Sequence, residues 1–173
     1  MGGNRPEIGP SSQDTKAFPM QKAQTLHYLF EILKQMEVLR PDWREYRQKA
    51  EKVLAQASPV TLEQDAAFRS VFTDIKEEQL MIYFLFTYFA GAVYDGDAWG
   101  KMKFSFAAVV LIRELFRAEW LQNPEAATAE ALQRTAWRFA RELEHSDPNK
   151  ELLERALKKE PLCSLRSLFT LLP

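Results

Sequence analysis

The sequence has few of the cysteines, histidines and glycine motifs by which metal-binding and catalytic proteins are usually recognised. Its 173 residues contain one cysteine, Cys163, and two histidines, His27 and His145. A single thiol excludes an internal disulfide and a cysteine-rich metal site, and the histidines lie far apart, so no intrinsic metal site is predicted. Only six glycines occur, without a GxGxxG or GxxxxGK[ST] phosphate loop, and GxSxG is absent. Motifs therefore assign no catalytic residue.

The sequence also has no excess of either positive or negative charge. The 23 Lys and Arg side chains are interspersed with 24 Asp and Glu, and the formal net charge is −1. No basic patch marks a nucleic-acid partner. The uncharged run from Leu80 to Tyr94 would form a helix of only ~22 Å, shorter than the roughly 30 Å hydrocarbon core of a bilayer. Neither nucleic-acid binding nor a membrane span is predicted, and the absence of a secretory signal favours a cytoplasmic location.

A helical pattern is what the sequence does contain. Prolines after residue 20 are few and stand near expected helix starts. Apolar side chains recur every three or four residues in two segments, Leu26, Leu29, Phe30, Leu33 and Met36, and Leu132, Ala136, Phe139, Ala140 and Leu143. We expect residues 1–20 to be a flexible lead-in and residues 21–173 to form a single all-α domain. The predicted fold is a helical bundle of about six to eight helices.

Two segments of this bundle carry unusually few charges. One runs from about Asp74 through the uncharged stretch to a Gly- and Asp-rich turn, and the other is uncharged from Phe104 to Ile112. A helix that is apolar on every face is normally covered on every face. The sequence therefore predicts one or two fully buried central helices around which the others pack.

Arg141 and His145 form the first candidate binding pair. They are four residues apart in a predicted helix, so their side chains share a face and could bind a carboxylate or phosphate. In the alternative interpretation, Arg141 pairs with Glu142 or Glu144 in solvent and His145 caps the helix.

A cluster of aromatic residues offers the second candidate. Its rings could line an apolar pocket with tyrosine hydroxyls as polar groups. Consecutive aromatics cover every side of a helix, so core packing is the competing interpretation. The residues concerned are Tyr83, Phe84, Phe86, Tyr88, Phe89 and Tyr94.

Taken in order, these segments resemble the C-terminal helical region of the flagellin lysine-N-methylase family. The similarity starts in LHYLFEILKQMEVLRPDWREYRQKAEKVL and continues through EEQLMIYFLFTYFAGAVYDGD, which includes Glu78 and Tyr83. It then passes through the apolar helix FSFAAVVLIRELF and ends in FARELEHSD, where Phe139, Arg141 and His145 match the family's Phe-x-Arg-x-x-x-His ending.

The resemblance implies a role in S-adenosylmethionine-dependent methylation of lysine side chains on flagellin, in the bacterial cytoplasm. It also implies that Arg141, His145, Glu78 and Tyr83 contribute to a substrate or cofactor surface. Full-length family members carry an N-terminal cysteine cluster thought to hold an iron–sulfur centre, whereas this sequence has only Cys163. The chain is therefore expected to be either a C-terminal domain or a shortened relative, catalytically incomplete alone.

Two non-enzymatic alternatives stay open from the sequence. One is a ligand-binding or dimerisation module similar to the regulatory domains of TetR-type repressors, with a pocket among apolar central helices. The other is an adaptor that binds a partner helix through its C-terminal segment LRSLFTLLP, in the helix-in-groove manner.

Overall fold

The protein is an all-α bundle, and the predicted fold class is confirmed. The computed structural model describes residues 12–57, 61–158 and 162–172, and these contain no β-strand. The predicted lead-in, residues 1–20, lies partly outside the described residues, and the first helix begins within it. The elements are α1 Ser12–Gln35, α2 Pro41–Gln56, α3 Leu62–Val71, α4 Asp74–Tyr88, η1 Phe89–Gly91, α5 Ala92–Asp95, α6 Ala98–Gln122, η2 Pro124–Ala126, α7 Ala129–Glu144, α8 Asp147–Lys158 and α9 Leu165–Phe169.

Local signals set most of these boundaries. Thr61 and Gln64 form a capping box at the start of α3. Pro41 is the first residue of α2, where its missing N–H removes no helical hydrogen bond. Thr128 caps α7 by accepting a hydrogen bond from the Ala131 N–H. Apart from Ala140, the residues of the two predicted apolar stripes are buried or pack against the core, along α1 with the residue after it and along α7.

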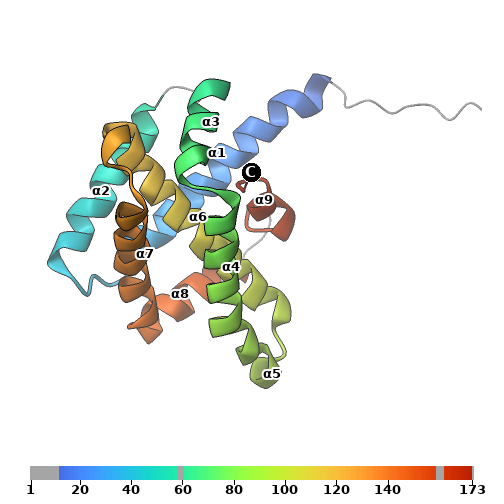
Figure 1. Cartoon of the computed structure of the whole chain (residues 1–173). Coiled ribbons are helices and arrows are strands. Elements are labelled where there is room, and N and C mark those ends of the chain that lie inside the picture. The colour runs from blue at the N-terminus through green and yellow to red at the C-terminus, as the bar shows by residue number, and fades with distance from the viewer. Residues whose placement is uncertain (1–11, 58–60, 159–161, 173) are drawn as a thin grey trace, which may run out of the picture.

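Helix α6 occupies the centre of the bundle (Figure 1). Every residue from Phe104 to Phe116 is buried, and α6 contacts α2, α4, α7, α8 and α9. Two charged residues are included in this stretch. Arg113 Nη1 donates to Glu114 Oε1 at 2.9 Å and to the Leu171 carbonyl at 3.0 Å, so the buried charge is paired.

Helix α4 does not have the predicted burial. Phe84 is its only buried residue, whereas Phe86 retains 83% of its accessible surface. The prediction took the absence of charge as evidence of burial on all sides. Instead, α4 packs along α6 on one side and leaves a largely apolar face in solvent.

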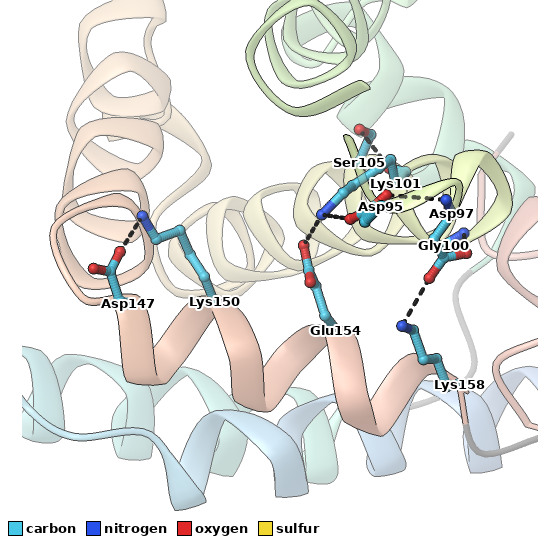
Figure 2. A network of polar contacts seen from close by, with 9 residues as sticks. All are labelled: Asp95, Asp97, Gly100, Lys101, Ser105, Asp147, Lys150, Glu154 and Lys158. Atoms are coloured by element: carbon cyan, nitrogen blue, oxygen red, sulfur yellow. Dashed lines mark hydrogen bonds and ion pairs between the residues drawn. The ribbon is translucent and has the colours of Figure 1, made fainter. Parts of the chain in front are cut away.

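A network of ion pairs fixes the turn between α5 and α6 against α8 (Figure 2). Lys101 Nζ lies 3.1 Å from Asp95 Oδ2 and 2.6 Å from Glu154 Oε1 of α8. Asp97 accepts a hydrogen bond from the Gly100 N–H, which caps α6, and pairs with Lys158 at 2.8 Å. The turn that ends the exposed face of α4 and α5 is thus connected to α8.

Replacing Gly100 by alanine is expected to lower the free energy of unfolding by about 1 kcal/mol. Alanine normally stabilises a helix relative to glycine by roughly 0.5–1 kcal/mol. Here its Cβ would lie 2.3 Å from Asp97 Oδ2, so the cap must turn away. Chemical denaturation measures the effect. In an Asp97→Ala background the same change should become stabilising, and equal losses in both backgrounds would contradict the explanation.

A buried polar joint connects the α1–α2 loop to the α7–α8 turn. The carboxylate of Glu142 accepts hydrogen bonds from the backbone N–H groups of Leu39 and Arg40, at 2.8 and 3.0 Å. The amide of Asn149 bonds the backbone N–H and carbonyl of Glu37 and the carbonyl of Glu142. Both side chains are 1% exposed. The joint satisfies loop groups that the helices leave unpaired.

The C-terminal segment packs on the protein itself. Leu168 and Leu171 are buried, Phe169 contacts the ring of Phe106 at 4.3 Å, and α9 contacts α1 and α6. Cys163 is fully buried in the same region. The adaptor hypothesis needed these leucines to be available to a partner helix, so it is wrong for this segment.

Candidate functional site

The exposed face of α4 is the most unusual surface of the described residues. Most of their exposed large apolar side chains lie within residues 75–99. One side of α4 combines exposed Asp74, Glu78, Ile82 and Phe86 with half-buried Glu77, Met81 and Leu85, at the three- and four-residue spacing of a helical face. We call this surface the α4 face, and its members are Asp74, Glu77, Glu78, Met81, Ile82, Leu85, Phe86 and Phe89.

The N-terminal half of the α4 face is an acidic cleft of about 370 Å³. It is lined by Arg69, Asp74, Glu77, Glu78, Met81 and Ile82. The Arg69 guanidinium pairs with Asp65 at 2.9 Å, so its charge is already engaged. Partial burial raises the pKa of the Glu77 carboxyl, since the ionised form is poorly solvated there. Its three carboxyl groups outnumber its one guanidinium, and this excess of negative charge favours a cationic ligand.

The C-terminal half of the α4 face is an apolar groove of about 460 Å³. Its walls are Leu85, Phe86, Phe89, Ala90 and Met102. Beyond it lie two further exposed rings, Tyr94 at 93% and Trp99 at 67% exposure. An exposed apolar groove of this kind is typical of a binding surface.

Tyr83 stands at the side of the α4 face and ties α4 to the end of α7. Its hydroxyl donates to the Glu144 carboxylate, at 2.8 Å from Oε1 and 3.0 Å from Oε2. Partial burial and the adjacent carboxylate raise the pKa of the Tyr83 hydroxyl. Glu78 lies five positions earlier, about 140° around the helix. The structure thus places Glu78 in the acidic cleft and Tyr83 on a different side of α4.

Arg141 and His145 both lie at the exposed end of α7. The Arg141 guanidinium stacks on the Trp137 ring at 5.0 Å, and Arg40 stacks on the same ring at 5.1 Å. Arg141 thus lies over an aromatic ring, whereas Glu142 accepts from loop N–H groups and Glu144 accepts from Tyr83. His145 occupies the C-cap position of α7, as the alternative interpretation expected.

The four predicted site residues therefore do not form one site: Arg141 lies over the Trp137 ring, and within the described residues no contact joins Arg141 or His145 to Tyr83 or Glu78. Tyr83 meets α7 at Glu144, beside His145, while Glu78 faces the acidic cleft with Glu77 and Asp74. The sequence did not predict the cleft because it forms between two helices: Arg69 comes from α3 and the other lining residues from α4. The available signal was the change along one helical face from carboxylates to aromatic side chains.

An iron–sulfur cluster does not fit the residues of this chain. Its single cysteine is fully buried in the core, and cluster iron requires several thiolate ligands. In the described ranges, no three His, Cys, Asp or Glu side chains come together as a group able to hold a metal ion. Likewise, none of the helices described reaches the length and apolar character that crossing a membrane demands.

Comparison with protein families finds a match over most of the chain. The model of the FliB lysine N-methylase C-terminal domain matches residues 8–171. The chain belongs to this family. Searches of curated proteins and of solved structures found no match. The resemblance to the C-terminal region of the lysine methylases is thereby confirmed over nearly the whole chain. Membership in the FliB C-terminal family assigns the protein to part of a lysine N-methylase, and a TetR-type module is no longer needed to explain the helical core.

Proposed function

We propose that this domain supports lysine methylation by holding the protein substrate, with flagellin as that substrate, in the bacterial cytoplasm. Methyl transfer itself is assigned to another part of the methylase. The observation that carries the proposal is the α4 face, an exposed surface suited to a protein partner in a chain that offers no cluster of metal ligands among its described residues. Family membership supplies the reaction, because the matching domain is named as part of a lysine N-methylase.

S-adenosylmethionine and the iron–sulfur cluster belong, in this proposal, to the full-length enzyme. When bound, S-adenosylmethionine supplies the methyl group. The residues of this chain contribute binding and orientation of the substrate, and a positioned substrate lowers the barrier of a bimolecular step by reducing its entropic cost.

Deletion and complementation test the proposal directly. Mass spectrometry of flagellin should find methyl-lysine in cells with the native gene, lose it on deletion, and recover it on complementation with the intact gene. A gene whose α4-face residues are mutated should restore little methylation. Methyl-lysine that persists in the deletion strain would show that flagellin is not the substrate.

Replacing both Arg141 and His145 by alanine in the complete enzyme is expected to reduce methylation about tenfold or more, at little change in melting temperature. Both side chains are exposed, so their loss leaves the core intact. A charge-assisted hydrogen bond to a substrate carboxylate contributes about 1.5–3 kcal/mol. Arg155→Ala removes an exposed arginine from α8 and serves as control. Unchanged methylation, or unfolding of the double variant, would count against the two residues as a binding pair.

A further inference from the structure

We propose that the α4 face binds a segment of the substrate protein in which a lysine and a large apolar side chain lie on the same side. The lysine enters the acidic cleft, and the apolar side chain enters the groove beyond it. This inference rests on the proposed function, which it deepens by naming the surface and the kind of segment that the surface recognises.

The charge of the cleft selects a cation. Asp74, Glu77 and Glu78 place three carboxylates around it. Arg69, the basic residue of its lining, pairs with Asp65, and Arg113, whose charge also acts on Glu77, pairs with Glu114. The methylene stem of a lysine would pack on Met81 and Ile82, while its ammonium reaches the carboxylates. A lysine side chain matches the cleft because it has both an apolar stem and a cationic end.

The groove sets the second requirement. Glu78 and Phe86 are eight residues apart on one helix, which separates cleft and groove by about 12 Å. That distance corresponds to two turns of a partner helix or to about four residues of an extended segment. A ligand that carries only a lysine would leave the groove empty, so the surface distinguishes lysines by the residues around them.

The α4 face is held in place before any partner binds. Phe84 anchors α4 beneath the face, Tyr83 ties it to α7 through Glu144, and Lys101 fixes the following turn to α8 (Figure 2). A surface that needs no ordering loses less entropy on binding. The rigidity therefore favours recognition of a defined segment.

A second copy of the chain is a poorer occupant. If the α4 helices of two copies packed in parallel, the three carboxylates of one copy would face those of the other. If they packed antiparallel, the carboxylates of each copy would be covered by the apolar side chains of the other. Burying carboxylates without a cation is unfavourable. A segment that brings its own lysine resolves this conflict.

Binding measurements with two probes test the inference. The probes are monomeric flagellin and a synthetic peptide whose lysine pair lies two helical turns from a Phe-Leu pair; an acetylated peptide, which lacks the lysine charge, serves as control. The Glu77→Gln/Glu78→Gln double variant and Phe86→Ala should each weaken binding of both probes about tenfold or more. Glu151→Gln and Leu62→Ala, exposed outside the α4 face, should leave the affinity within twofold of wild type.

The outcomes separate this inference from the function on which it rests. If flagellin binds equally well to wild type and to the α4-face variants, the α4 face is not the binding surface, while the substrate assignment stands. Suppose that only the peptide binds, and that its binding is lost on acetylation of the lysines and on Phe86→Ala in the protein. The surface is then supported, and flagellin is the wrong substrate. Equal affinity for the acetylated peptide, no binding of either probe, or a dimer that Phe86→Ala dissociates would overturn the inference.

Discussion

Replacing Phe84 by alanine is expected to lower the free energy of unfolding by about 3–5 kcal/mol. The ring is 1% exposed and meets Phe139 of α7 edge-on at 6.4 Å and Tyr88 in a stack at 6.1 Å. It is the only buried residue of α4, so its loss leaves a cavity at the place where the helix is held. Urea denaturation followed by circular dichroism measures the change.

Phe86→Ala is the matched control for this prediction. The same residue type is removed from the same helix two positions later, but its ring is in solvent. Its loss should change the stability by less than about 0.5 kcal/mol. Similar losses for Phe84 and Phe86 would mean that the exposed face is covered within the folded chain, and the assignment of the binding surface would fail with it.

Replacing Glu142 by alanine is expected to cost about 2–4 kcal/mol. Two backbone N–H groups, those of Leu39 and Arg40, would lose their acceptor inside the joint between the α1–α2 loop and α7. An unsatisfied buried donor costs about 1–3 kcal/mol. Thermal and urea denaturation measure the loss. Glu151→Ala, which removes an exposed carboxylate from the adjoining helix α8, should cost much less.

The same carboxyl gives a pH dependence. Burial raises the pKa of Glu142 above its ordinary value, despite the two N–H donors. The folded protein therefore takes up this proton before the unfolded chain does as the pH falls. The penalty for burying the ionised form is full at neutral pH and is relieved as the pH falls through the folded-state pKa. The stability of wild type relative to Glu142→Gln should thus rise on acidification, and a difference independent of pH would contradict the assignment.

The helices and their caps were largely predictable because their signals are local. The stripe through Leu29 and Leu33, the Thr61 capping box and the Thr128 start of α7 depend on residues a few positions apart. The burial of α6 was predictable for the same reason, since its apolar run extends over several turns.

The exposure of α4 could not be read in this way. Apolar side chains look the same in a sequence whether their own chain covers them or another protein does. Phe84 and Phe86 differ only in which side of α4 meets α6 and α7, and that is decided by packing between distant segments. The family resemblance pointed to both Glu78 and Tyr83. Only the fold shows that Glu78 lines the acidic cleft whereas Tyr83 is hydrogen-bonded to α7.

The single thiol gives the protein a built-in reporter of its own opening. Cys163 has no accessible surface in the folded state, and no other cysteine competes for reagent. A thiol-specific dye can therefore react only when the C-terminal segment detaches or the whole chain unfolds. The labelling rate at increasing urea would distinguish these two events without any engineered probe, and it would show whether a bound partner slows that opening.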